Sequence, residues 1–173
     1  MTNFKEDLQC IKAFIFDIDG VLSQQTITLD GNGDPIRTIN LRDGYALQLA
    51  VKKGYRIAVI SGGNSTSFKN RLSTLGVKHV YLQCSKKKTV FNEFLTNENL
   101  DPSEILYMGD DIPDFEAMKA AGVAVCPADA DSEIKQISQY VSDKNGGEGC
   151  VRDVIEQVLR LHGNWMNHDA YTW

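Results

Sequence analysis

The chain has 173 residues, of which 42% are hydrophobic and 24% charged, and its formal net charge is −5. This length suits one compact domain around one core. The negative charge argues against nucleic acid and acidic membranes as partners, so a phosphate-bearing ligand would need a local cation such as a metal ion.

The cysteines are widely spaced and form no CxxC pair: Cys10, Cys84, Cys126 and Cys150. Free thiols of this kind, beside apolar residues, favour a reduced, cytoplasmic setting. The first residues mix charges of both signs, and the apolar run at 11–16 is interrupted by Lys12. We therefore expect neither a signal peptide nor a membrane span there.

Short apolar segments alternate with amphipathic ones, which is typical of βα units that feed a parallel sheet. The apolar segments predict buried strands at 11–16, 55–61, 79–83, 105–109 and 123–126. Apolar residues at three- and four-residue steps predict helices at 43–53, 64–75, 86–97, 112–121, 131–138 and 149–161. Gly54, Gly76 and Gly122 are predicted to end the helices before them. The expected fold class is α/β, a Rossmann-like parallel sheet between helices.

Residues 26–41 break this alternation and predict a β-hairpin flap, with its turn at Asp-Gly-Asn-Gly, residues 30–33. No repeat or linker divides the chain, so we predict one domain over residues 1–173. Its last residues, 162–173, carry aromatic side chains without helical spacing. They predict a tail that is either frayed or docked.

Polar side chains follow the predicted strands at their carboxyl ends, where open parallel sheets bind ligands. In chain order these are Asp17 and Asp19, then Ser61 with Gly62, then lysines 86–88, and finally Asp110, Asp111 and Asp114. Taken alone, each of these groups most often has an ordinary structural role: it forms a turn, caps a helix or lies on a solvent-exposed face. Their shared position at successive strand ends predicts one crevice that holds carboxylates, a hydroxyl and an amine.

Several carboxylates cannot share a crevice in ionised form unless a cation compensates them. Oxygen ligands without His or Cys favour a hard ion, and a site that keeps room for substrate favours Mg²⁺. A calcium-binding EF-hand loop does not fit. Counted from Asp17, position twelve is Thr28, and counted from Asp30, position six is Pro35.

The segments FDIDGVL, ISGG, the lysine after the third strand and GDDIPD resemble, in order and spacing, the four motifs of the haloacid dehalogenase superfamily of phosphatases. The segments INLRDGYAL, RLSTLGV and GGEGCVRDVIE resemble its cap-less subgroup, which acts on eight- and nine-carbon keto-sugar acid phosphates. Within that subgroup the chain is most similar to the enzymes that hydrolyse 3-deoxy-D-manno-octulosonate 8-phosphate. The resemblance covers essentially the whole chain, and neither gap between motifs has room for a cap domain.

The resemblance implies a cytoplasmic phosphomonoesterase of lipopolysaccharide precursor synthesis. Asp17 would be the nucleophile that forms an aspartyl-phosphate, and Asp19 would be the general acid and base. Ser61 would bind a phosphoryl oxygen, and Lys87 would neutralise charge on the phosphate and the nucleophile. Lys87 is preferred over its lysine neighbours because Tyr81 and Ser85 set the alignment.

The resemblance also implies that Mg²⁺ is held by Asp17, the backbone carbonyl of Asp19 and Asp110, while Asp111 and Asp114 orient the ligands or the lysine. The implied substrate contacts are Asp19, Asn40, Leu41, Arg42, Asp43, Gly44, Ser61, Gly62, Arg71 and Lys87. The arginines among them suit a sugar carboxylate. A homotetramer is implied as well, in which a neighbour's hairpin helps to close each site.

Gly63 and Gln48 stand where the octulosonate phosphatases often carry arginine. A nine-carbon keto-sugar acid 9-phosphate, of deaminoneuraminate or N-acetylneuraminate, is therefore the alternative substrate. Two non-enzyme interpretations stand beside these. A phospho-receiver would need a lone Asp after the third strand, where residues 81–83 are Tyr-Leu-Gln. An inactive regulatory homologue would not need the full set of catalytic side chains that is present.

Overall fold

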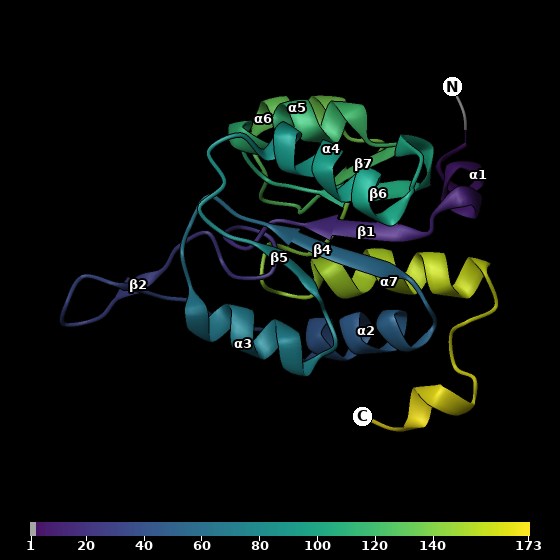
Figure 1. Ribbon diagram of the computed structural model, residues 1–173, viewed down its shortest axis with the longest axis horizontal. Helices are drawn as coiled ribbons and strands as arrows, with labels where there is room; N and C mark the ends of the chain where they lie inside the picture. The colour runs from purple at the N-terminus through teal and green to yellow at the C-terminus, as the bar shows by residue number, and fades with distance from the viewer. Residues whose placement is uncertain (1–2) are drawn as a thin grey trace.

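The computed structural model describes residues 3–173 and shows two layers of helices around one sheet (Figure 1). In this part of the chain the sheet has six strands in the order β5-β4-β1-β6-β7-β8, and all of its pairings are parallel. The strands are β1 (Ala13–Phe16), β4 (Arg56–Ile60), β5 (His79–Tyr81), β6 (Ile105–Met108), β7 (Val123–Cys126) and β8 (Tyr140–Val141). The predicted α/β fold is confirmed.

The longer helices lie where the sequence predicts them: α2 (Leu41–Lys52), α3 (Thr66–Thr74), α4 (Lys87–Glu98), α5 (Phe115–Ala120), α6 (Ser132–Ile137) and α7 (Cys150–Leu161). The shorter helical segments are α1 (Phe4–Asp7), η1 (Leu8–Cys10), η2 (Pro102–Glu104), η3 (Ile112–Asp114) and η4 (His168–Tyr171). Figure 1 shows α2, α3 and α7 on one face of the sheet and α4, α5 and α6 on the other. Among the described residues, no helix is long and apolar enough to cross a membrane.

The central strand β1 contributes to both cores. Phe14 and Phe16 pack in the apolar cluster on the α2 and α7 side, whereas Ala13 and Ile15 pack in the cluster on the α4 and α5 side. All four are fully buried. This alternation is the two-residue period of a strand, and burial on both faces explains the continuous apolar sequence.

The chain reverses its direction of travel across the sheet beside β1. From β1 it moves outward through β4 and β5, and it then returns to the other side of β1 and moves outward through β6, β7 and β8. Phe16, the last residue of β1, pairs with Val59 on one side and with Met108 on the other. The segments that follow β1, β4 and β6 therefore meet at one edge, at the switch point where such sheets bind ligands.

The predicted hairpin is present but short, with strands β2 (Thr28–Leu29) and β3 (Pro35–Ile36). It projects from the body of the molecule at the left of Figure 1. In the described chain the hairpin and α2 are the elements between β1 and β4, so no cap domain lies in that gap.

The carboxyl-terminal segment packs on its own chain, mainly against α2. The hydroxyl of Tyr45 donates to the carbonyl of Ala170. Trp165 and Trp173 both make edge contacts with the ring of Tyr45, and Lys53 pairs with Asp169. Docking, rather than fraying, is the arrangement in this structure.

Three details differ from the sequence expectations. Strand β8 was not predicted. Gly54 and Gly76 have the positive φ of a helix end, at 87° and 86°, but Gly122 is not left-handed. It lies so close to the backbone of Ser103 that a Cβ would be 2.6 Å from its carbonyl oxygen. The apolar neighbours of the cysteines are typical of buried free thiols. All four are free, but Cys84 is half-buried and Cys10, which ends η1, is exposed.

Candidate active site

A row of ion-paired side chains at the end of β1 forms the centre of the site. Lys87 Nζ lies 2.6 Å from Asp17 Oδ2 and 2.9 Å from Asp114 Oδ1. The hydroxyl of Tyr107, in β6, donates to the same Asp114 oxygen at 2.8 Å. Burial alone would lower the pKa of Lys87, but the charges of Asp17 and Asp114 outweigh it and raise that pKa. Lys87 is therefore held as a buried cation.

The structure separates Lys87 from the two lysines beside it. Lys87 begins α4 and is 5% exposed, with its ammonium inside the site. Lys86 precedes the helix and is exposed, and Lys88 donates to the carbonyl of Glu116 at the surface. The structure thus places in the site the lysine that the alignment with Tyr81 and Ser85 selected.

Asp17 follows β1 directly and is 7% exposed. Its Oδ1 accepts the backbone N–H of Ile18 at 2.6 Å, and its Oδ2 faces Lys87. Burial and then the charge of Asp114 raise the pKa of Asp17 well above its ordinary value, while Lys87 opposes the shift. An added cation would favour the ionised form, which is the form that can act as a nucleophile.

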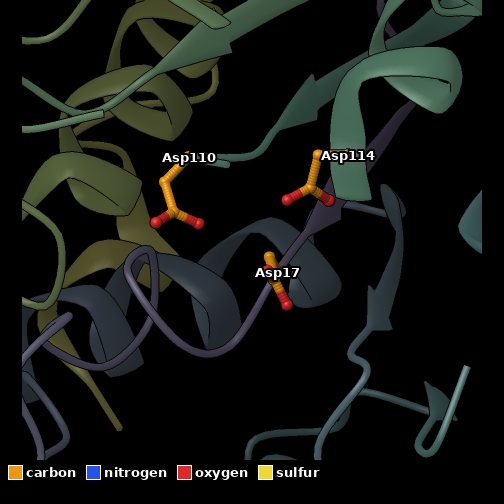
Figure 2. Close-up of side chains that lie close together, drawn as sticks. All are labelled: Asp17, Asp110 and Asp114. Carbon is orange, nitrogen blue, oxygen red and sulfur yellow. The ribbon is translucent and has the colours of Figure 1, made fainter. Parts of the chain in front are cut away.

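Asp17, Asp110 and Asp114 form a cluster of carboxylates, which Figure 2 shows close together. Asp17 follows β1, Asp110 lies in the loop after β6, and Asp114 lies in η3. One ligand oxygen from each lies within 4.8 Å of the others. Burial, and then the charge of Asp114, raises the pKa of Asp110 to about 7. Asp114 Oδ2 is buried and has no hydrogen-bond partner in the described chain. Crowded, partly unsatisfied carboxylate oxygens fit a hard divalent cation such as Mg²⁺.

Gly20 brings Asp110 against the backbone that follows Asp19. A Cβ at Gly20 would lie 2.0 Å from Asp110 Oδ2, and its φ of 84° also favours glycine. The side chain of Gln25 donates to the same Asp110 oxygen at 3.2 Å. The loop after β1 and the loop after β6 are thereby held together, as a ligand set shared between them requires.

Ser61 stands at the end of β4, next to Asp17 across the sheet, and is 2% exposed. Its backbone N–H donates to the carbonyl of Tyr81 at 3.0 Å. Its hydroxyl oxygen accepts the N–H of Gly63 at 3.2 Å. Ser61 and Gly62 line the cavity, where hydroxyl and backbone donors suit the oxygens of a phosphoryl group.

Asp19 pairs with an arginine that the sequence did not indicate. Arg37, just after β3, donates from Nε to Asp19 Oδ1 at 2.7 Å and from Nη2 to Oδ2 at 2.9 Å. Its remaining nitrogen, Nη1, donates to the carbonyl of Asn64 at 3.2 Å. Hydrogen bonding by Asp19 is the main cause of a raised pKa of Arg37.

These groups surround one cavity of about 540 Å³, a volume that suits a small ligand. Eight of the residues predicted for the site line it: Asp17, Asp19, Ser61, Gly62, Lys87, Asp110, Asp111 and Asp114. Lys87 is the one cation among its lining residues in the described chain, against seven Asp residues. The cavity is therefore strongly acidic until a cation enters.

Six residues that the resemblance implied as substrate contacts lie outside this cavity: Asn40, Leu41, Arg42, Asp43, Gly44 and Arg71. Asn40 caps α2, and Asp43 is buried with Oδ1 accepting the N–H of Arg152 at 2.7 Å. Arg42 lines a separate surface hollow together with Arg152 and Arg160. Within one chain, the structure does not bring this set to the catalytic groups.

Sequence reasoning missed five residues at the site: Gln25, Arg37, Tyr107, Asp129 and Asp131. Asp129 and Asp131 follow β7, so the strand-end rule would have found them if it had been applied to one more strand. Tyr107 has the sequence context of a core residue. Gln25 and Arg37 flank the hairpin, where nothing in the spacing indicates that their side chains turn inward.

The chain matches a known protein family in sequence. A profile of the family described as "Haloacid dehalogenase-like hydrolase" matches residues 44–128. Together with the fold and the relatives that follow, this match means that the chain belongs to the haloacid dehalogenase-like hydrolases.

Individual relatives give a more specific similarity than the family profile does. The chain is 34% identical over 153 residues to the 3-deoxy-D-manno-octulosonate 8-phosphate phosphatase KdsC of Salmonella typhi. The aligned residues cover 88% of this chain and 81% of that protein. The crystal structure of the phosphatase of the same name from Yersinia pestis has a TM-score of 0.90 and 30% identity, over 93% of this chain and 87% of that one. The Moraxella catarrhalis phosphatase, solved with magnesium ion, phosphate ion and KDO, has a TM-score of 0.90 and 29% identity, over 97% and 95% of the two chains.

Proposed function

We propose that this chain is a Mg²⁺-dependent phosphomonoesterase that hydrolyses 3-deoxy-D-manno-octulosonate 8-phosphate to the free sugar acid and phosphate, as a step in lipopolysaccharide precursor synthesis. The observation that carries the proposal is the buried Lys87 between Asp17 and Asp114, beside the acidic cluster. The substrate assignment is supported by relatives of that name that match most of the chain.

In the first half-reaction, a carboxylate oxygen of Asp17 forms a bond to phosphorus while the bond between phosphorus and the sugar oxygen breaks. Asp19 supplies the proton that the departing sugar oxygen takes up. Lys87 and Ser61 stabilise the negative charge that develops on the phosphoryl oxygens. The products of this step are the free sugar acid and an aspartyl-phosphate at Asp17.

In the second half-reaction, a water oxygen forms a bond to phosphorus and the bond to Asp17 breaks. Asp19 accepts the proton of that water and is ready for another cycle. This step regenerates the carboxylate of Asp17. The ammonium of Lys87, which lies 2.6 Å from Asp17 Oδ2, stabilises that carboxylate. Asp114 keeps the lysine in place through the 2.9 Å contact on its other side.

Asp17, the backbone carbonyl of Asp19 and Asp110 would hold Mg²⁺, with Asp111 and Asp114 as the outer groups that orient them. When bound, the ion supplies charge that offsets the carboxylates and polarises the phosphoryl group. The raised pKa of Asp110, to about 7, supports a site that needs a cation at neutral pH. The magnesium ion in the Moraxella catarrhalis structure supports the same choice of metal.

The test is phosphate release with Mg²⁺ from octulosonate 8-phosphate, the two nine-carbon acid 9-phosphates and hexose phosphates. We expect a clear preference for the octulosonate ester and no turnover by Asp17→Asn at wild-type circular dichroism. Appreciable activity of Asp17→Asn would exclude Asp17 as the nucleophile. Preference for a nine-carbon ester would correct the substrate, and no turnover of any ester would favour a regulatory role.

We also propose a homotetramer in the cytoplasm. Four exposed apolar side chains lie on the hairpin and at its base: Leu29, Ile36, Ile39 and Leu41. Such a group supports contact with another copy of the chain. In that assembly Leu41 and Arg42 would belong to a neighbour's site, while Asn40, Asp43 and Gly44 would hold the hairpin base in position beside Arg71. Sedimentation equilibrium tests the assembly, and a monomer would contradict it.

A further inference from the structure

Arg37 pairs with Asp19, which lines the cavity, although Arg37 is not itself a lining residue. Both oxygens of Asp19 accept hydrogen bonds from the same guanidinium, at 2.7 and 2.9 Å. The side chain of Arg37 is 6% exposed although the hairpin around it is open to solvent. This arginine is therefore inserted into the site from the hairpin and is not part of a solvated face.

Gly63 leaves the room that the guanidinium fills. A Cβ at Gly63 would lie 2.6 Å from Arg37 Nη2 and 3.3 Å from Asp19 Oδ2. A side chain at position 63 and the guanidinium of Arg37 would thus compete for the same space. In this chain the cation at that place comes from the hairpin, not from the loop after β4.

The bidentate pair conflicts with the proposed role of Asp19. As long as Arg37 holds both oxygens, Asp19 cannot turn freely toward a departing sugar oxygen. Productive reaction therefore requires another anion to take over the guanidinium. The phosphoryl group is already provided with Lys87, Ser61 and the acidic metal cluster. Because Asp19 is the proposed proton donor to the departing sugar oxygen, the guanidinium that holds Asp19 would lie next to that sugar.

On the basis of the phosphatase function proposed above, we propose that Arg37 recognises the carboxylate of the sugar acid and that this exchange frees Asp19. The fork of an arginine donates the same two parallel hydrogen bonds to any carboxylate. Replacing Asp19 by a substrate carboxylate therefore loses little of the pairing. A neutral sugar phosphate offers no carboxylate, so Arg37 stays on Asp19. Arg37 is then a specificity-determining residue for acids over neutral sugars.

The test compares two esters, octulosonate 8-phosphate and D-arabinose 5-phosphate, which has no carboxylate. For Arg37→Ala we expect kcat/KM on the octulosonate ester to fall about 100-fold, with a raised KM, because charge-assisted hydrogen bonds are lost. On arabinose 5-phosphate we expect kcat to stay level or to rise, because Asp19 is free. Arg37→Lys keeps the positive charge but cannot donate two parallel hydrogen bonds. Its kcat/KM on the octulosonate ester should therefore lie between those of the wild type and Arg37→Ala.

Two further variants make the result specific. Arg37→Ala combined with Gly63→Arg supplies a guanidinium from the loop after β4, because removal of the Arg37 side chain leaves room for a Cβ at position 63. This double variant should regain part of the activity on the octulosonate ester and leave the activity on the neutral ester as it is in Arg37→Ala. Arg56→Ala is the matched control, because Arg56 pairs with Glu98 at 3.6 Å at the opposite end of β4. It should leave kcat and KM on both esters at the wild-type values.

Equal losses on both esters in Arg37→Ala would overturn the inference and leave Arg37 as a residue that only holds the hairpin. The wild type tests the proposed function separately. If it prefers a nine-carbon acid ester, the proposed substrate is wrong, and the loss in Arg37→Ala must then appear on that ester. If it prefers the neutral ester, both proposals fail. Inhibition by free octulosonate, weakened in Arg37→Ala, measures carboxylate binding without turnover.

Discussion

Asp43 is a carboxylate in the core, and we expect its ionisation to oppose folding. It is 1% exposed, and its Oδ2 has no hydrogen-bond partner within residues 3–173. Burial raises the pKa of Asp43 from 3.8 to about 6, although the N–H groups of Arg152 and Gly149 partly oppose the shift. This difference corresponds to about 3 kcal/mol between the neutral and ionised forms.

The sign of the effect follows from linkage. The folded pKa lies above the unfolded one, so the folded state binds the proton more tightly. The contribution of Asp43 is fully present below about pH 4 and is lost as pH rises through about 6. Asp43→Asn cannot ionise, so its stability relative to the wild type should rise by about 3 kcal/mol between pH 4 and pH 7.5.

Urea unfolding followed by circular dichroism, in EDTA so that metal binding does not contribute, measures both proteins across this range. The part of the difference in unfolding free energy that does not change with pH reports the effect of the new amide group. The change of that difference with pH reports the ionisation of Asp43. Asp34→Asn is the control, because Asp34 is an exposed residue of the hairpin turn, and its difference from wild type should stay flat. A flat difference for Asp43→Asn as well would refute the assignment of a costly buried charge.

Three further outcomes are expected. Lys87→Ala should lose turnover by about 100-fold or more while Lys86→Ala keeps it, measured as phosphate release, because Lys87 alone of the two reaches the nucleophile; similar losses would contradict this. Gly146→Ala should lower the free energy of unfolding in urea by about 1–3 kcal/mol, because its Cβ would lie 2.0 Å from the carbonyl oxygen of Gly20; unchanged stability would mean that this loop yields easily. Chelation by EDTA should abolish turnover and added Mg²⁺ should restore it, and activity that survives dialysis against EDTA would argue against the metal.

The sheet could be predicted because its central strands are buried on both faces. Their apolar runs, such as Ala13–Phe16, have no competing explanation. Strand β8 escaped prediction because Tyr140 and Val141 form a two-residue edge strand that is partly exposed. Gly122 was assigned to a helix end, but its requirement for glycine comes from the approach of Ser103, which lies far from it in sequence.

The acidic groups could be predicted because strand ends meet at one edge of a parallel sheet, and local sequence then decides which side chains are there. The residues that hold the lining side chains in place could not be predicted in the same way. Arg37 reaches Asp19 across 18 residues, and its direction depends on how the hairpin folds back. Tyr107 supports Asp114 from within a core strand, so nothing in its surroundings distinguishes it from a packing residue.

The hydroxyl of Tyr107 connects the reaction centre to the interior of the sheet, since the bonds run from this core side chain through Asp114 and Lys87 to Asp17. These catalytic side chains are consequently expected to become ordered, and to lose their order, together with the sheet. The hairpin that precedes Arg37 has a different status, because β2 and β3 pair with each other alone and stand apart from the sheet. An engineer who wished to change the accepted ester could therefore rebuild the hairpin around Arg37, whose pair with Asp19 must be kept, and leave the bonds from Tyr107 to Asp17 intact.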